Sequence, residues 1–175
     1  MKRDIAKLEA VTQFTKRAHE FCRLIETRNR LTKRAFVHKC TELIAKLQSE
    51  YVALLAVKTR PSAYRHQPEP FPYEQYRRLY QKLAAKFAQD NIYYLVFDPY
   101  KVDPDEPITA TLSDDLADIY GDLKKGLSLI DRADSRDRHD AVWTWKFHFL
   151  VQTGHHCVSA LRALQELLER YHEND

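Results

Sequence analysis

All seven prolines of this 175-residue chain fall between Pro61 and Pro107, and the chain contains only three glycines. Proline and glycine interrupt helices more readily than other residues, so the segments before and after this region can run as long, unbroken helices. The length suits one well-buried core and is short for two domains. We therefore expect a single domain of long helices joined through a proline-rich connector.

Apolar residues recur at steps of three and four along most of the chain, the spacing that gives a helix one apolar side. Thr32 is a suitable N-cap for the second such segment, and the short turn before it predicts an antiparallel hairpin. The fold class is predicted to be all-α, a single-domain antiparallel bundle of about five helices. The predicted helices cover about residues 4–27, 32–57, 73–89, 113–131 and 140–171.

The run from Ile92 to Phe97 is six consecutive apolar residues, too short for periodicity to distinguish a strand from a connector. A lone strand would have no partner, and no second strand is evident. The run is therefore predicted to be an apolar connector. The loop over 58–72 and the segment 92–112 are expected to pack against the bundle.

The helix predicted over 113–131 carries several aspartates. Ser113 is the predicted N-cap, followed by acidic residues in the first turn, where they complement the helix dipole. At 100° per residue, Asp118 points nearly opposite the apolar stripe, and Asp115 and Asp122 lie together toward one side of it. These three carboxylates could converge on a metal ion or a cationic partner. Solvation explains them equally well, and we favour a solvent-exposed face.

The helix predicted over 140–171 has apolar residues on two opposite sides. Trp145, Phe149 and His156 lie on one of them. Such a helix is either central in its bundle or exposes one side to a partner, and the central position is favoured. Gly154 would let another backbone approach closely. The other side, predicted to face the core, carries Trp143, Phe147, Leu150, Gly154, Val158, Leu161, Gln165 and Leu168.

Metal-binding helices usually carry ligands at i, i+3 or i, i+4, and neither an E-x-x-H nor an H-x-x-x-H pattern is found in this last helix. A metal site would need His156 or His148 to combine with aspartates of the preceding helix, and the candidate ligands are Asp115, Asp118, Asp122 and His156. No phosphate-cradling glycine loop or other catalytic motif is identified, and no cofactor is expected. A metal-binding protein or metal-dependent hydrolase using these four residues is the alternative to the favoured, non-enzymatic role.

The three cysteines are widely separated and lack C-x-x-C spacing, which is typical of reduced thiols in a cytosolic protein. No apolar run approaches the roughly 20 residues that a membrane span needs, and the charged start of the chain lacks the apolar core of a signal peptide. The protein is therefore expected to be cytoplasmic, without a membrane partner.

The charge is unevenly placed along the chain. Residues 1–66 contain 15 Lys/Arg and 6 Asp/Glu, a net charge of +9, whereas residues 67–175 contain 13 and 19, a net charge of −6. Weak nucleic-acid binding through residues 1–66 is one interpretation. The other interpretation is that two basic helices pack against acidic helices, and that a cluster of Lys and Arg side chains is exposed at a helix turn. We favour the second, with Arg28, Arg30, Lys33 and Arg34 as the solvated cluster.

Several blocks of sequence carry a resemblance to a known family. They are F-C-R-L-I-E (21–26), Y-Y-L-V-F-D-P-Y (93–100), L-S-D-D-L-A-D-I-Y-G-D-L-K-K-G-L (112–127), W-T-W-K-F-H-F (143–149), and G-H-H (154–156) with A-L-R-A-L (160–164). On these blocks the chain resembles the bacterial family called domain of unknown function 5063 over nearly its whole length. The resemblance implies a compact, all-α bacterial domain and no particular activity.

The expected function is therefore that of a cytosolic helical interaction or regulatory module. Its contact surface is expected on the last two predicted helices, with Tyr120, Trp145 and Phe149 as candidate residues. The expected partner is another protein, of unknown identity.

Overall fold

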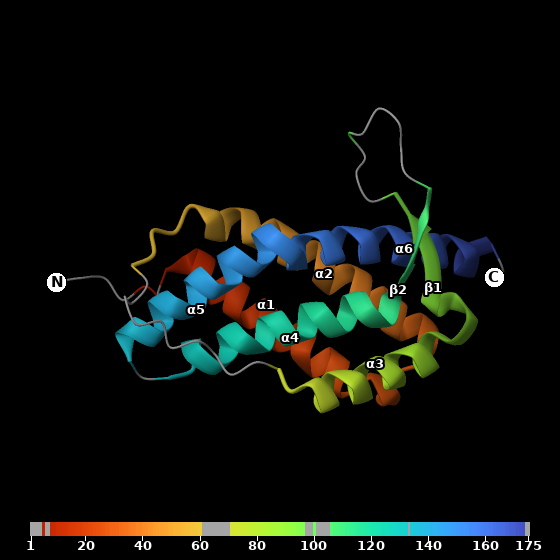
Figure 1. The fold of residues 1–175 in the computed structure, drawn as a ribbon, viewed down its shortest axis with the longest axis horizontal. Coiled ribbons are helices and arrows are strands. Elements are labelled where there is room, and N and C mark those ends of the chain that lie inside the picture. The colour runs from red at the N-terminus through yellow and green to blue at the C-terminus, as the bar shows by residue number, and fades with distance from the viewer. Residues whose placement is uncertain are drawn as a thin grey trace.

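The structure is a computed structural model that describes residues 5, 8–60, 71–96, 100, 106–132 and 134–173. In this part of the chain no helix is long and apolar enough to cross a membrane. Figure 1 shows long helices lying side by side and a small hairpin. The elements are α1 (Glu9–Glu26), α2 (Lys33–Leu55), α3 (Tyr73–Phe87), β1 (Ile92–Leu95), β2 (Ile108–Thr111), α4 (Leu112–Ile130), α5 (Ser135–His148) and α6 (Gly154–Glu173), with short 3-10 turns at Arg28–Arg30 and Ala88–Asn91.

The predicted all-α class is confirmed, and the predicted cap of α2 is correct, since the Thr32 side chain accepts a hydrogen bond from the Ala35 backbone N–H. A short π-helix, Phe149–Thr153, joins α5 to α6 without a turn, so these elements form one long helical rod. This rod begins at Ser135, five residues before the predicted start of the last helix.

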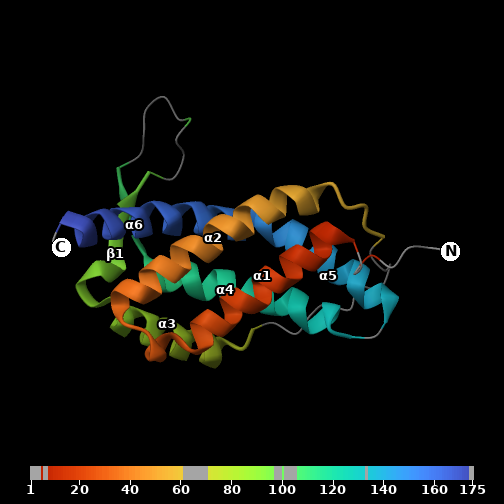
Figure 2. The ribbon, with the colours of Figure 1, turned by 180° about the vertical axis from the view of Figure 1, so that it is seen from behind.

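Helix α4 is the central helix, with α1, α3, α5 and α6 all packed against it. Figures 1 and 2 show it crossing the middle of the molecule from both sides. The prediction that the last helix is central is therefore wrong. Small residues explain the difference, because Ala117, Gly121 and Gly126 are buried and let neighbours approach α4 on sides that its apolar stripe does not occupy.

The predicted inward side of the last helix is also wrong. Phe147, Leu150 and Val158 are 46%, 70% and 59% exposed, whereas Trp145 and Phe149 from the opposite side are buried. Both sides have helical spacing and large apolar residues, so periodicity alone cannot select between them. The packing of α4 selects the Trp145 side.

Gly154 has no room for a side chain because of the backbone of its own helix. Its N–H donates to the carbonyl of Phe149, five residues earlier, which closes the π-turn. A Cβ at this position would lie 2.5 Å from that carbonyl oxygen. Only glycine fits without a shift, and the backbone that approaches Gly154 belongs to its own rod and not to another helix.

The run beginning at Ile92 is a strand. Residues Ile92–Leu95 pair antiparallel with Ile108–Thr111, with Ile92 opposite Thr111 and Leu95 opposite Ile108. The prediction of an unpaired connector is wrong because residues Ile108–Thr111, three of which are β-branched and favour an extended backbone, supply the partner strand. Parts of the predicted loops, residues 61–70, 97–99 and 101–105, lie outside the described residues.

Helix α4 begins directly after β2, and its cap is Thr111, not the predicted Ser113. The Thr111 hydroxyl accepts from the Asp114 N–H at 3.3 Å, and the Ser113 N–H donates to the Asn91 side-chain oxygen at 3.0 Å. Two of the free N–H groups at the start of the helix are thus satisfied. The hairpin therefore fixes the first turn of α4, from which the aspartates project.

Candidate functional site

The aspartates of α4 are largely removed from solvent. Asp115 and Asp122 are each 4% exposed, and the Asp118 side chain is 24% exposed. The favoured interpretation of a solvent-exposed acidic face is therefore wrong. This interpretation failed because β1, α3 and α6 cover the polar side of α4. A helical wheel drawn for one helix does not include such neighbours.

His156 of α6 lies between two of these carboxylates. Its Nδ1 is 2.8 Å from Asp115 Oδ1, and its Nε2 is 3.2 Å from Asp118 Oδ2. Burial lowers the pKa of His156, but the hydrogen bond to Asp115 and the charge of Asp118 outweigh burial, and the net pKa is raised. Burial also raises the pKa of Asp118 to about 6, against the attraction of His156. The contacts of His156 with the two carboxylates thus join α6 to α4.

Two tyrosines extend this network to other elements. Tyr93 of β1 donates its hydroxyl to Asp115 Oδ2 at 2.6 Å, and Tyr76 of α3 donates to Asp114 Oδ1 at 2.5 Å. Burial, followed by these hydrogen bonds, raises the pKa of both tyrosines, so the hydroxyls remain protonated donors. Neither tyrosine was identified from the sequence, because no local pattern connects them to aspartates 22 and 38 residues away.

Asp122 belongs to a separate set of contacts. Thr153, at the end of the π-helix, donates to Asp122 Oδ2 at 2.6 Å, and Lys125 Nζ lies 2.8 Å from Oδ1. His148 Nδ1 approaches Oδ1 to 3.3 Å but makes no hydrogen bond with any described residue. Burial, aided by Lys125, lowers the pKa of His148, so this histidine is neutral near pH 7 and Lys125 supplies the charge that balances Asp122.

The four candidate metal ligands do not converge. His156 contacts Asp115 and Asp118, whereas Asp122 faces Lys125 and Thr153. The described part of the chain contains no group of three or more His, Cys, Asp or Glu side chains that could hold a metal ion. The metal-binding alternative is therefore not supported. Chemically, this network can exchange protons between imidazole and carboxylate, and structurally it joins four elements.

The three candidate surface residues lie in the core. Trp145 is fully buried, and its Nε1–H donates to the Leu123 carbonyl at 3.2 Å. Phe149 is 3% exposed and stacks on Tyr51, with 4.6 Å between ring centroids. Tyr120 is 8% exposed and donates its hydroxyl to Glu26. The prediction that these side chains form a binding surface is therefore wrong.

An apolar surface is present on the opposite side of the same rod. Phe147, Leu150, Val151 and Val158 are between 46% and 70% exposed. Their offsets of three, four and eleven residues from Phe147 keep them on one side of the rod, and we call this set the apolar stripe. Large apolar side chains clustered on one exposed side are typical of a binding surface.

The end of α2 borders the apolar stripe. Lys146, next to Phe147, donates to the backbone carbonyls of Leu55 and Val57 at 3.0 Å each, which holds α5 against this end. Val52 and Leu55 are 66% and 46% exposed there. The apolar stripe thus has further exposed apolar side chains beside it.

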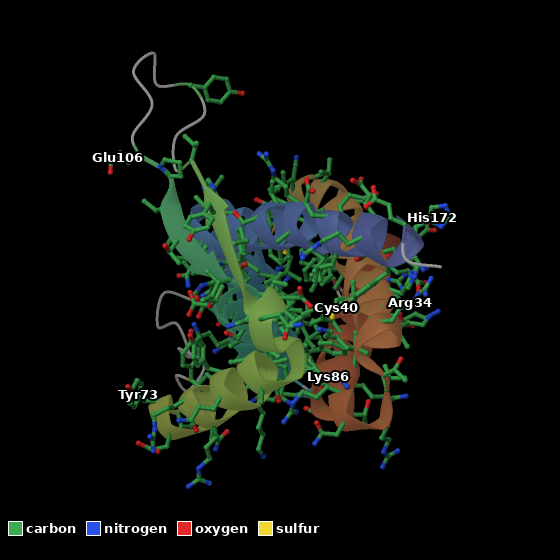
Figure 3. All side chains as sticks on the ribbon, turned by 90° about the vertical axis from the view of Figure 1, so that its right-hand side faces the viewer. Arg34, Cys40, Tyr73, Lys86, Glu106 and His172 are labelled. Atoms are coloured by element: carbon green, nitrogen blue, oxygen red, sulfur yellow. The ribbon has the colours of Figure 1, made fainter. Side chains whose placement is uncertain are left out.

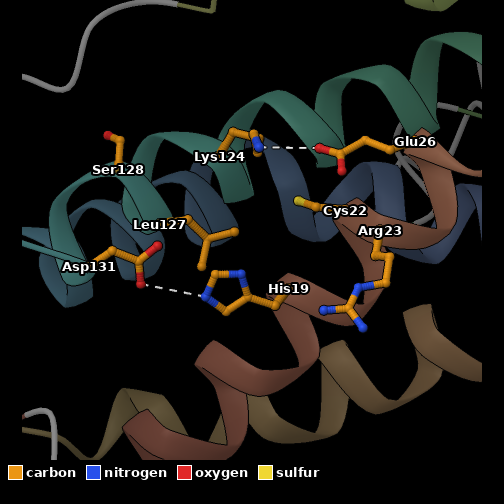
Figure 4. Close-up of a pocket in the computed structure, with 8 residues that line it drawn as sticks. All are labelled: His19, Cys22, Arg23, Glu26, Lys124, Leu127, Ser128 and Asp131. Carbon is orange, nitrogen blue, oxygen red and sulfur yellow. Dashed lines mark hydrogen bonds and ion pairs between the residues drawn. The ribbon is translucent and has the colours of Figure 1, made fainter.

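A cavity of about 290 Å³ lies between α1 and α4 (Figure 4). Its carboxylates are already paired, because Glu26 contacts Lys124 at 3.2 Å and Asp131 lies 3.5 Å from His19 Nε2. Burial raises the pKa of the Cys22 thiol to about 12, so this side chain is not a thiolate nucleophile near pH 7.

Comparison with known proteins places the chain among relatives. The family model described as domain of unknown function (DUF5063) matches residues 7–170. The chain belongs to this family. The resemblance noted in the sequence is confirmed, and the family description names no activity. A comparison with curated proteins finds no match.

A solved structure has the same fold. Protein BF1032 from Bacteroides fragilis, a structural genomics target, matches with a TM-score of 0.76 and 22% sequence identity. The match covers 93% of this chain and 94% of that protein. At this identity the likeness concerns the fold alone, and the DUF5063 chain described here shares that helical arrangement over nearly its full length.

Proposed function

We propose that this DUF5063 domain is a protein-interaction module whose partner binds the apolar stripe. The observation that carries the proposal is the exposure of Phe147, Leu150, Val151 and Val158 on one side of a rod whose other side fills the core. An amphipathic helix of a partner can lay its own apolar side along such a stripe, with contacts repeating every three or four residues. The ion-paired network behind α6 keeps the rod in place.

The size of the stripe suggests the strength of the interaction. Complete burial of an exposed aliphatic or aromatic side chain contributes about 1.5–3 kcal/mol. Because these four side chains are about half exposed, covering them would contribute on the order of 3–6 kcal/mol. Micromolar binding requires about 8 kcal/mol, so contacts with Val52 and Leu55 on α2 are needed as well.

The test is site-specific photo-crosslinking in cells. A photoreactive amino acid placed at Val151 is expected to capture a defined partner, whereas the same group at the exposed Gln165 of α6 captures none. The partner is then purified, and its affinity is measured for the wild type and for Leu150→Lys, an exposed position where lysine does not disturb the core.

The affinity is expected to fall at least tenfold in Leu150→Lys, while thermal unfolding followed by circular dichroism stays unchanged. A crosslinked homodimer would identify the partner as a second copy of the chain. Equal capture at Val151 and Gln165, or equal affinity of the two proteins, would overturn the proposal.

A further inference from the structure

The uneven charge of the chain is not neutralised where the helices meet. The aspartates at the centre of α4 face His156, Lys125 and the tyrosine hydroxyls instead of the basic residues of α1 and α2. At the end of α1 the acid is on α1, since Glu26 pairs with Lys124 of α4, and Asp131 at the end of α4 faces His19 and no Lys or Arg of α1. The interpretation that the basic hairpin packs on acidic helices therefore does not account for its charge.

Helix α3 adds cations to the turn between α1 and α2. Arg78, Lys82 and Lys86 follow one another at steps of four residues, so they lie along one side of α3. Lys86 Nζ bonds to the backbone carbonyl of Leu31, which places this side of α3 next to Arg30. We call Arg30, Arg78, Lys82 and Lys86 the basic row. Figure 3 shows the nitrogen atoms of this end of the molecule, with Lys86 and Arg34 labelled.

The basic row is not balanced by nearby acids. Arg30, Arg78 and Lys82 are exposed and form no ion pair or hydrogen bond through their side chains with any described residue. Asp90, which follows α3, already contacts Lys33 at 2.5 Å and Arg170 at 3.2 Å, and Glu26, at the end of α1, is paired with Lys124. The row is therefore a positive surface that can accept an external anion.

We propose that the basic row binds the phosphate backbone of a single-stranded nucleic acid. From Arg78 to Lys86 the row extends about 12 Å along the helix axis, a length over which one strand presents about three phosphates. Arg30 continues it past the end of α3. Tyr73, at the start of α3, is 73% exposed and lies past the end of the row on another side of the helix, so an unpaired base can stack on its ring where the strand bends around the start of α3.

The composition of α3 argues against a membrane surface as the ligand. Helices that lie on membranes insert several large apolar side chains beside their cations. Among the described large apolar side chains of α3, more than a third of the area is exposed at Tyr73 alone. This residue lies at the end of the helix and not beside the basic row. The proposal also extends beyond residues 1–66, because three of its four cations belong to α3.

The test is fluorescence anisotropy with the whole protein and labelled 20-nucleotide oligouridylate and oligothymidylate strands. Three to four phosphate contacts predict that the logarithm of the affinity falls with the logarithm of salt concentration with a slope of about −2 to −3. The double variant Arg78→Glu, Lys82→Glu is expected to bind at least tenfold more weakly at 50 mM salt, with a shallower slope.

The charge-matched control is Lys58→Glu, Arg60→Glu, at exposed positions beyond the far end of α2. It should bind within about twofold of the wild type if the row, and not net charge, is responsible. Leu150→Lys should also bind normally, so the outcome is independent of the apolar stripe. Tighter binding to uridylate than to thymidylate would identify RNA as the ligand. Equal loss in both double variants, or binding to anionic vesicles but to neither strand, would overturn the proposal.

Discussion

Replacing Gly126 by alanine is expected to destabilise the protein strongly, although alanine is the better helix former. An alanine Cβ at this position would lie 2.0 Å from Trp145 Nε1 and 2.2 Å from Cε2. The indole has little room to move, because it is fully buried, packs against Phe14 with 5.0 Å between centroids, and donates a hydrogen bond to the Leu123 carbonyl. The helices α4 and α5 must therefore separate locally.

The change in unfolding free energy combines one stabilising and two destabilising contributions. Alanine gains about 1 kcal/mol over glycine inside a helix. Overpacking a core position costs about 1–3 kcal/mol. Displacing the indole from its carbonyl partner leaves a buried donor unpaired and costs a further 1–3 kcal/mol or so. The net loss of unfolding free energy is expected to be about 1–5 kcal/mol, most of it from the contact with Trp145.

Gly121→Ala is the matched control, since it makes the same substitution in the same buried helix. A Cβ there would lie 3.4 Å from Phe71 Cδ1, an ordinary contact. This variant is expected to be unchanged or up to about 1 kcal/mol more stable. Urea denaturation followed by far-UV circular dichroism measures both variants. If Gly126→Ala proves as stable as Gly121→Ala, the close packing of α4 on Trp145 is refuted.

Four other substitutions test the buried network and the orientation of the rod. Phe149→Ala is expected to lower the unfolding free energy by about 3–5 kcal/mol and Phe147→Ala by less than about 1 kcal/mol, in urea denaturation; the reverse order would restore the orientation predicted from periodicity. Thr153→Val should cost about 1.5–3 kcal/mol by removing a donor to a buried carboxylate, and an unchanged denaturation midpoint would show that this bond contributes nothing. Because folding raises the pKa of both His156 and Asp118, the folded state binds more protons, so stability should fall as pH rises from about 4 through 6 for Asp118 and above 6.5 for His156. His156→Gln should flatten the second part of this dependence in denaturation curves measured between pH 6 and 8, and an unaltered slope would contradict the raised pKa.

The candidate site shows how far sequence reasoning extended. The sequence indicated that the aspartates of α4 and His156 could meet, and in the structure His156 contacts Asp115 and Asp118. Asp122 was grouped with them because it shares their side of the helix, yet the π-turn at Gly154 gives it Thr153 as its own partner. A one-residue change in helical register is not visible in apolar periodicity, and this change decided which residues converge.

The sequence by itself determined the local elements of this protein. The positions of proline and glycine, the repeat of apolar residues and the cap at Thr32 depend on neighbours within about one helical turn, and these predict the helices and the all-α class. Only the tertiary structure decided which side of the last helix is buried. Both of its sides have apolar residues at helical spacing, and the choice depends on whether α4 can receive Trp145 at Gly126, 19 positions earlier in the chain. Burial of the α4 aspartates was decided in the same way, by Tyr93 and His156, which lie 22 and 41 residues from Asp115 and reach it only in the folded chain.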